Sequence, residues 1–230
     1  MSDEEYTPTA RTTPTRSRER VGYDRRAVHA VLDEATTCHV GFVVAGRPVV
    51  LPQLHVRVGE DLYLHGSTGA RALRSADGQG LEVCVTVTLV DGLVLARSAF
   101  HHSVNYRSVV AQGRAELVTD PAEKTTALAA LVDAVVPGRS AATRGPDRRE
   151  LAATAVLRLR LHEVSLKVRS GPPVDDPEDL VLPHWAGVLP LSTRRGRPVP
   201  APDVAAGTRL PGHVQAWVSG GTTTEERPSG

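Results

Sequence analysis

The sequence predicts a mainly β protein, an antiparallel β-barrel of six strands with peripheral helices. Apolar residues alternate with polar ones at a period of two through most of residues 38–118, which is typical of strands with one buried face. Tight turns such as Ala45-Gly46 join these segments, whereas parallel neighbours would require long crossovers. Helical patterns are confined to the start of the chain and to the stretch before the last strand. An antiparallel barrel therefore fits better than an alternating α/β fold.

Capping residues and turns set the expected order of the elements. Asp24 can cap a first helix that runs to about residue 35. Strands are expected at residues 38–44, 47–58, 62–65, 81–90, 93–100, 108–118 and 155–169. Asp91-Gly92 is a strong hairpin signal, so the strands on either side of it are expected to pair with each other. Asp120 followed by Pro121 predicts a second helix that ends near residue 136, and residues 148–153 add a short third one.

Changes in composition divide the chain into four parts. Residues 1–19 are polar and lack periodic apolar positions, so we expect a disordered N-terminal arm. The barrel domain is expected over residues 20–170. Residues 171–218 are rich in Pro and Gly and are expected to form a C-terminal extension that packs on the barrel, followed by a disordered tail at 219–230.

Charge and hydropathy exclude several classes of partner. The 27 basic residues are offset by 26 acidic ones, and aromatic residues make up only 3% of the chain, so no nucleic-acid partner is expected. No window approaches the roughly 18 consecutive apolar residues of a membrane span. The opening residues are unlike a signal peptide, and we therefore expect a soluble, cytoplasmic protein.

Cysteine usage argues against disulfides and Cys-rich metal sites. The two cysteines, Cys38 and Cys84, each lie in an apolar run and are expected to be buried free thiols. No tight spacing of His, Cys and Asp residues provides the three or four ligands that zinc requires, so no metal site is expected.

A small polar loop after the third predicted strand carries the clearest functional signal. Gly66 allows backbone N–H groups to come close to a ligand, Ser67 and Thr68 offer hydroxyl groups, and Arg71 offers a bidentate guanidinium. These features suit a phosphate group. A β-meander that leads into such a loop indicates a small barrel that holds a phosphorylated cofactor.

Several motifs taken together resemble a known family. In order and spacing the sequence resembles the pyridoxamine 5′-phosphate oxidase-like, flavin-nucleotide-binding split-barrel proteins over roughly residues 20 to 170, and most resembles their 5-nitroimidazole-reductase (Nim-like) branch. The motifs that carry this resemblance are Gly46-Arg-Pro-Val-Val-Leu-Pro52, Leu62-Tyr-Leu-His-Gly-Ser67 with Arg71, Asn105-Tyr-Arg-Ser-Val-Val110, Gly113 and Asp120-Pro-Ala-Glu-Lys124. The resemblance implies a homodimer of FMN-binding split barrels with two flavin sites between the subunits. FMN is the usual cofactor, and other branches use F420 or haem.

The family's cofactor-binding positions can be transferred to this chain residue by residue. The resemblance implies that Leu51 and Pro52 approach the flavin ring and that Thr86 and Thr88 lie near its edge. It implies that the phosphate and ribityl chain are lined by a loop and a following arginine, namely His65, Gly66, Ser67, Thr68 and Arg71. It also implies that three residues from the loop before the next strand reach the flavin, in one or the other subunit: Ser103, Asn105 and Tyr106.

The resemblance implies a flavin (FMN)-dependent oxidoreductase that acts on a small molecule, with His65 as the candidate catalytic residue. The C-terminal Arg-x-His pattern of the oxidase itself has no counterpart here, so vitamin B6 oxidation is not expected. Two alternatives stay open. One is a haem-binding split-barrel protein with His65, His101 or His102 as the axial ligand, and the other is a non-enzymatic flavin-binding protein.

Overall fold

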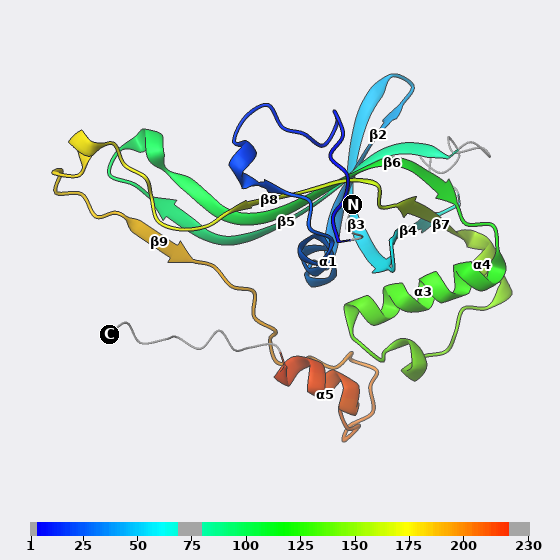
Figure 1. Cartoon of the computed structure of the whole chain (residues 1–230). Coiled ribbons are helices and arrows are strands. Elements are labelled where there is room, and N and C mark those ends of the chain that lie inside the picture. The colour runs from blue at the N-terminus through cyan, green and yellow to red at the C-terminus, as the bar shows by residue number, and fades with distance from the viewer. Residues whose placement is uncertain (1–3, 69–79, 221–230) are drawn as a thin grey trace.

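Six antiparallel strands close into a barrel in the computed structural model, which describes residues 4–68 and 80–220 (Figure 1). The order around the ring is β6-β7-β4-β3-β2-β5, and the pairing of β5 with β6 closes it. The strands are β2 (Thr37–Val44), β3 (Arg47–Val58), β4 (Asp61–Ser67), β5 (Leu81–Leu95), β6 (Ser103–Leu117) and β7 (Thr154–Arg160). The predicted six-stranded antiparallel barrel is confirmed.

The barrel is split between β3 and β4. These two strands pair only where residues 55–58 meet residues 61–64. Before that point β3 pairs with β2, and beyond it residues 65–67 of β4 pair with β7. The end of β4 therefore has one open edge within the described part of the chain, which is where a ligand can approach the backbone.

Alternating side chains build the core inside the ring. In β5, Val83, Val85 and Val87 are at most 4% exposed, while the residues between them face outward. Helix α1 (Arg25–Glu34) closes this interior with Val28, Val31 and Leu32. Asp24 caps α1 as expected, since its side chain accepts a hydrogen bond from the Ala27 N–H at 2.7 Å.

Two helices cover the outer face of the barrel at the split. Helix α3 (Pro121–Val135) packs on β3, β4 and β7, where Tyr63, Val118, Ala127 and Val156 form a second apolar cluster. Helix α4 (Arg148–Ala153) leads directly into β7. The cap of α3 is also confirmed, because the Asp120 carboxylate accepts from the Glu123 N–H at 2.9 Å.

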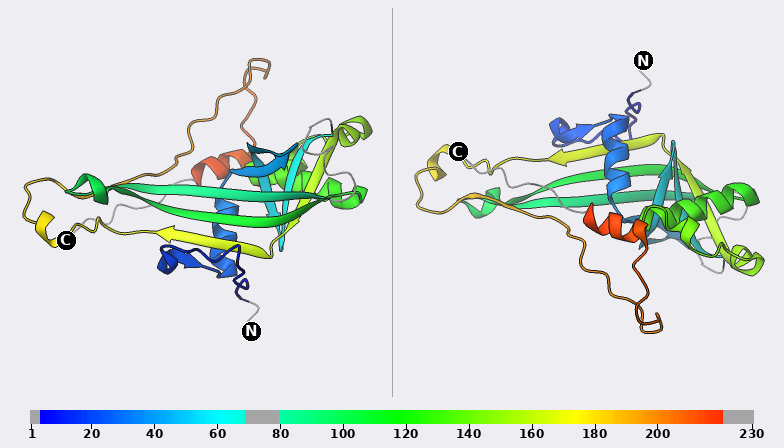
Figure 2. Two further views of the ribbon diagram at one scale, coloured as in Figure 1. Left: turned by 90° about the horizontal axis from the view of Figure 1, so that it is seen from above. Right: turned by 90° about the horizontal axis from the view of Figure 1, so that it is seen from below.

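Strands β5 and β6 continue beyond the barrel as a long twisted arm (Figure 2). Strand β8 pairs with β6, β1 pairs with β8, and β9 pairs with β5 near the distal end of the arm. The remaining elements are β1 (Val21–Gly22), β8 (Glu163–Arg169), β9 (Gly187–Pro190), helix α5 (Gly212–Ser219) and the short 3-10 helices at Arg18–Arg20, Ala99–His101, Ser140–Ala142 and Pro177–Asp179. No helix in the described ranges is long and apolar enough to cross a membrane.

Two strand predictions were wrong. Asp91-Gly92 forms no hairpin turn, because β5 runs through it with an irregularity in its pairing, and the chain turns only after residue 95. A Cβ on Gly92 would lie 3.0 Å from the Leu189 carbonyl oxygen, so the glycine lets β9 approach β5. The strand expected at 155–169 is divided into β7 and β8.

The expected N-terminal arm and the expected thiols also differ from the structure. From residue 4 onward the N-terminal segment packs on the barrel, because Tyr6 is 1% exposed and its hydroxyl hydrogen-bonds to His29 and Glu60. One aromatic anchor thus orders a segment whose composition is polar. Cys38 is buried, but Cys84 is only half-buried, because it lies on the outward face of β5. The tail predicted at 219–230 lies outside the described residues except for its first two.

Candidate cofactor site

The end of β4 presents the predicted phosphate loop at the split. Ser67 pairs with Thr154 of β7, and the Thr68 N–H donates to the Ala153 carbonyl at 3.0 Å, so the loop is held against the start of β7. The His65 Nδ1 atom is buried and has no hydrogen-bond partner among the described residues. Buried polar atoms rarely go without a partner, so this atom indicates a ligand or water. Arg71 lies outside the described residues.

A cavity of about 370 Å³ opens beside Thr68. Thr119 and Thr154 add hydroxyl groups to its lining, and Lys124 adds a positive charge. The Lys124 ammonium donates to the Leu151 carbonyl at 2.7 Å and so is held at the rim. The rest of the lining is mostly apolar, and the Thr68 and Thr154 hydroxyls donate to the Ala153 and Glu150 carbonyls, so Lys124 is the group in this cavity that can attract a phosphate.

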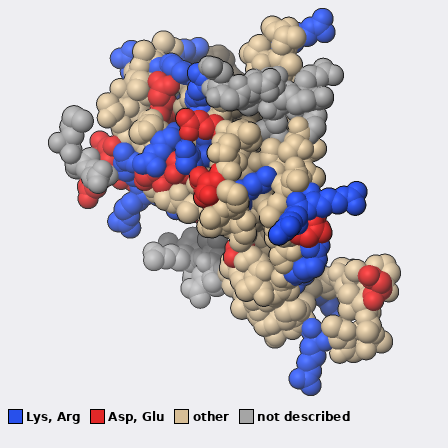
Figure 3. Space-filling model, turned by 90° about the vertical axis from the view of Figure 1, so that its right-hand side faces the viewer, with Lys and Arg blue, Asp and Glu red and all other residues tan. Residues whose placement is uncertain are grey.

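A second, charged cavity is less suited to an anion. It is lined by Asp61, Arg114, Glu116, Arg158 and Arg160, and the charges on this side of the molecule alternate in sign (Figure 3). Arg158 lies 3.0 Å from Glu116, and Arg160 lies 3.3 Å from Asp61. These ion pairs neutralise Arg158 and Arg160, so the cavity beside Thr68, with its Lys124 ammonium, is the better candidate for a phosphate site.

The outer face of β2, β3 and β5 brings two predicted residues together around a histidine that sequence reasoning missed. His39 of β2 is directly opposite Pro52 of β3 on one side and Thr86 of β5 on the other. Directly opposed residues of an antiparallel sheet point to the same face. His39 is exposed, and its side chain has no hydrogen bond or ion pair within the described ranges. The alternation of residues 37–44 placed His39 outward, but only the strand register shows its neighbours.

The two residues predicted to approach the flavin ring face opposite ways. Leu51 pairs with Val40, which is 4% exposed in the core, whereas Pro52 shares the outer face with His39. Thr88 lies on that outer face two residues beyond Thr86, and its hydroxyl hydrogen-bonds to that of Ser108 at 3.0 Å. Pro52, Thr86 and Thr88 are therefore grouped, and Leu51 is not.

The third predicted group lies on the arm, away from the phosphate loop. Asn105 is 8% exposed, donates to the Gly171 carbonyl at 3.1 Å and accepts from Arg169, so it fastens the chain after β8. Ser103 and Tyr106 belong to the same distal part of β6. Thr86 pairs with Val110 of β6, and Asn105 lies five residues before Val110, which is roughly 17 Å along the strand. One chain does not bring these residues to His65, and their contribution from a second subunit stays a prediction.

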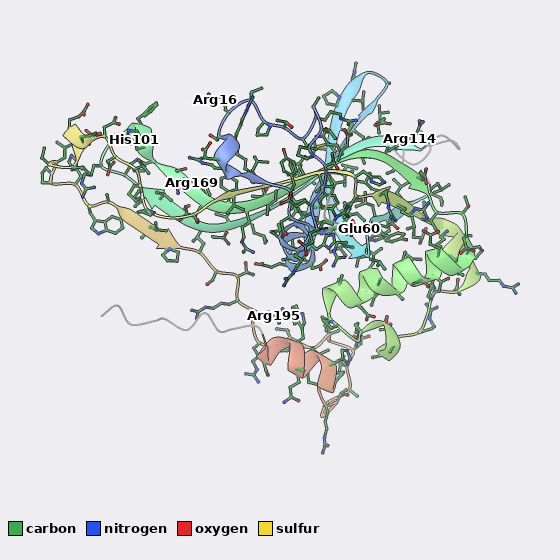
Figure 4. The ribbon with its side chains drawn as sticks, in the orientation of Figure 1. Arg16, Glu60, His101, Arg114, Arg169 and Arg195 are labelled. Atoms are coloured by element: carbon green, nitrogen blue, oxygen red, sulfur yellow. The ribbon has the colours of Figure 1, made fainter. Side chains whose placement is uncertain are left out.

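Of the two histidines named as alternative haem ligands, His101 lies near the tip of the arm (Figure 4), and His102 follows it at the end of the 3-10 helix Ala99–His101. His101 Nε2 is 3.0 Å from the Asp176 carboxylate, and this hydrogen bond raises the pKa of the imidazole. The same pair and Asp179 bring three groups that can ligate a metal within 4.8 Å of one another. His102 Nδ1 lies 3.0 Å from the Ser98 carbonyl oxygen. Both imidazoles thus hold the tip together.

Three solved structures show what this chain is similar to. The flavocytochrome Anf3 from Azotobacter vinelandii is 39% identical with a TM-score of 0.86, and the match covers 92% of this chain and 98% of that one. An FAD- and haem-binding protein from Mycobacterium smegmatis is 42% identical with a TM-score of 0.81, covering 86% and 97%. A candidate 5-nitroimidazole antibiotic resistance protein from Bacteroides thetaiotaomicron is 21% identical with a TM-score of 0.54, covering 64% and 86%, and shares the fold.

The sequence itself matches a family profile. A comparison with curated proteins finds no match. The profile described as pyridoxamine 5′-phosphate oxidase matches residues 24–168, which include the whole barrel, the split and the loop at the end of β4. This chain therefore belongs to the pyridoxamine 5′-phosphate oxidase family.

Proposed function

We propose that this protein is a redox protein that binds a flavin nucleotide and haem and acts on a small molecule. The observation that carries the proposal is the 39% and 42% identity, over most of the chain, to a flavocytochrome and to an FAD- and haem-binding protein. Identity at this level over nearly the full length reaches beyond the barrel, into the extension after residue 170. When bound, a flavin supplies hydride and electron transfer, and haem supplies one-electron chemistry.

The residues at the split fit the phosphate-bearing end of a flavin nucleotide. The open edge of β4 and the ammonium of Lys124 offer donors to a phosphate. The orphaned Nδ1 of His65 can hydrogen-bond to the bound nucleotide. Pro52 and Thr86 then face the ring. The sequence suggested FMN, and the relative from M. smegmatis favours FAD.

The chain also offers histidines for haem iron. Of the three that the sequence suggested, His101 and His102 hydrogen-bond within the tip of the arm, whereas His65 has an unused ring nitrogen. Haem iron commonly takes a histidine as its axial ligand. The catalytic role suggested for His65 is to position the flavin or the substrate by hydrogen bonding.

A second copy of the chain would complete the molecule. The arm and the extension expose large apolar side chains, including Phe100 at 89%, Trp185 at 65% and Val181 at 85%. Several large apolar side chains this exposed on one part of the molecule favour a protein interface there. We therefore propose a homodimer, in which Ser103, Asn105 and Tyr106 of one subunit lie closer to the cofactor of the other than to their own.

Absorption spectroscopy tests the proposed function. The purified full-length chain, after incubation with excess FAD, FMN and haem and removal of the unbound cofactors, should show both flavin bands and a Soret band. Chromatography of the flavin released by denaturation then separates FAD from FMN. A chain that retains neither chromophore contradicts the proposal, and one that retains flavin alone reduces it to a flavoprotein.

A further inference from the structure

A cavity of about 590 Å³ lies where the C-terminal extension crosses β5. One wall is formed by residues 34–37, at the end of α1 and the start of β2, and by residues 88–91 of β5. The opposite wall is formed by residues 191–195 of the extension and by Trp217 of α5. The Leu191 N–H donates to the Asp91 carbonyl at 3.0 Å and holds the extension beside β5. Sites for small molecules commonly have this size.

The cavity adjoins the residues that the proposed function places at the flavin ring. Thr37 precedes His39 by two residues on β2, so it lies about 7 Å farther along the same outer face. Thr88 follows Thr86 by the same interval on β5. His39 is itself directly opposite Thr86. A molecule in the cavity would therefore lie beside a flavin ring that faces Pro52 and Thr86.

One cation of the cavity has no acidic partner. Arg195 belongs to the segment between β9 and α5 (Figure 4), and it forms no ion pair with any residue in the described ranges. Its guanidinium carbon lies 4.0 Å from the centre of the Trp217 ring, and one of its N–H groups donates to the Trp217 carbonyl. These contacts orient the planar group and leave its other donors open. An arginine held in this way offers a fork that fits a carboxylate.

The other charges of the cavity limit how much negative charge a ligand can carry. Arg107 of β6 lies 2.8 Å from the Asp91 carboxylate and donates two hydrogen bonds to Glu34. One arginine thus faces two carboxylates, so this side of the cavity is negative. A singly charged ligand suits Arg195, whereas a doubly charged phosphate would meet more repulsion from Glu34 and Asp91.

The rest of the lining suits a small molecule with polar and apolar parts. Leu89 and Leu191 offer apolar surface. Several hydroxyl groups have no hydrogen-bond partner among the described residues and can bind polar atoms of a ligand, namely those of Thr36, Thr37, Ser192 and Thr193.

We propose that this cavity binds the small-molecule substrate, that the substrate carries a carboxylate, and that Arg195 binds this carboxylate. The inference rests on the proposed function and deepens it, because it names the chemical class of the molecule on which the protein acts. It also gives the extension a role. Residues 191–195 and Trp217 supply the wall and the cation that the barrel lacks at this place.

Titration of the flavin-loaded protein with benzoate and with hexanoate tests the assignment, and the neutral amides benzamide and hexanamide are the matched ligands. NMR of the Trp217 indole N–H reports binding, and Trp185→Phe identifies this resonance because the chain has two tryptophans. At least one carboxylate should shift the resonance in a saturable way and perturb the flavin absorption bands. Its amide should bind at least about tenfold more weakly, because it makes no charge-assisted hydrogen bond with the arginine.

Two variants separate ligand binding from a structural role of the arginine. Arg195→Gln should weaken binding of the carboxylate at least about tenfold and leave binding of the amide unchanged. Arg197→Gln is the matched control, because Arg197 is another exposed arginine of the same segment and lies outside the cavity lining. Glu34→Gln removes a negative charge from the opposite wall and should tighten carboxylate binding about twofold. Loosening of α5 would not produce this gain.

Several outcomes overturn the inference. Wild-type affinity for the carboxylate in Arg195→Gln does so, and so does equal affinity of the wild type for carboxylate and amide. A wild type that holds flavin but binds neither carboxylate, or whose flavin bands stay unchanged when one binds, also overturns it. Tighter binding of inorganic phosphate than of either carboxylate would show that the anion class is wrong. Failure of the wild type to bind flavin contradicts the proposed function instead.

Discussion

The barrel and the arm share β5 and β6 but differ in how their apolar residues are covered. Within the barrel, Val83, Val85 and Val87 are at most 4% exposed, whereas farther along the same strand Val90 is 46% and Leu93 is 40% exposed. The barrel closes on its own side chains and on α1. The arm leaves one face uncovered, which is the surface that a second subunit would fill. The difference separates the surface that one chain covers alone from the surface that the proposed homodimer would cover.

The largest effect that the comparison predicts is in the barrel core. Leu64 is 1% exposed, and Leu64→Ala should lower the free energy of unfolding by about 2–5 kcal/mol, because the substitution leaves a cavity. Leu180→Ala is the matched control, since this leucine of the extension is 57% exposed and should change the free energy by no more than about 0.5 kcal/mol. Urea denaturation measures both. Equal losses of unfolding free energy in the two variants would contradict the difference between the barrel core and the extension.

The arm should respond in assembly rather than in stability. Phe100→Ser combined with Trp185→Ser should raise the dissociation constant of the dimer at least about tenfold, because exposed aromatic anchors carry much of the binding energy of interfaces. Light scattering across a dilution series measures this shift, and the thermal midpoint of the monomeric fraction should stay unchanged. A wild-type chain that is monomeric at micromolar concentration with its cofactors bound argues against the homodimer.

A smaller effect is expected at the split. His65→Ala should weaken flavin binding several-fold, up to about tenfold, because the bound nucleotide loses one hydrogen bond. Fluorescence titration with the flavin gives the affinity, and His162→Ala serves as the control because His162 is an exposed histidine outside the proposed site. Unchanged affinity would leave the Nδ1 atom of His65 bonded to water.

The smallest predicted effect is a pH dependence at the tip of the arm. The hydrogen bond to Asp176 raises the pKa of His101 above its usual 6.5. The contribution of this exposed pair is therefore fully present below pH 6.5 and is lost as the pH rises through the pKa of the folded state. Following the His101 ring protons by NMR should give a higher pKa in the wild type than in Asp176→Asn. Identical titrations would show that the contact does not persist in solution.

Local signals in the sequence predicted much of the fold. The caps at Asp24 and Asp120 place α1 and α3 within a residue of their observed starts. Alternation in residues 37–44 and 81–87 correctly separates the buried from the outward positions. The Asp91-Gly92 dipeptide wrongly predicted a hairpin turn. Its glycine instead lets β9 pack closely against β5, and β9 lies almost 100 residues farther along the chain, so no local signal shows it.

The candidate site was predicted less completely. Its geometry depends on which strands pair and in what register, and on distances along the arm, and neither is set by neighbouring residues in the sequence. The family resemblance gave Pro52 and Thr86, and the structure places both on one face. It did not give His39, because nothing local shows that β2 lies between β3 and β5. Leu51 lies on the other face from Pro52, because the side chains of neighbouring residues in a strand point to opposite faces.

Simultaneous binding of the two cofactors to one preparation tests the central claim most directly. Equilibrium dialysis of the full-length protein against flavin, haem and both together gives the number of each bound per chain. We expect about one flavin and one haem per chain, with each bound equally well in the presence of the other, because a protein that uses both cofactors together holds them at separate sites. Displacement of flavin by haem, or binding of only one of them, would contradict it.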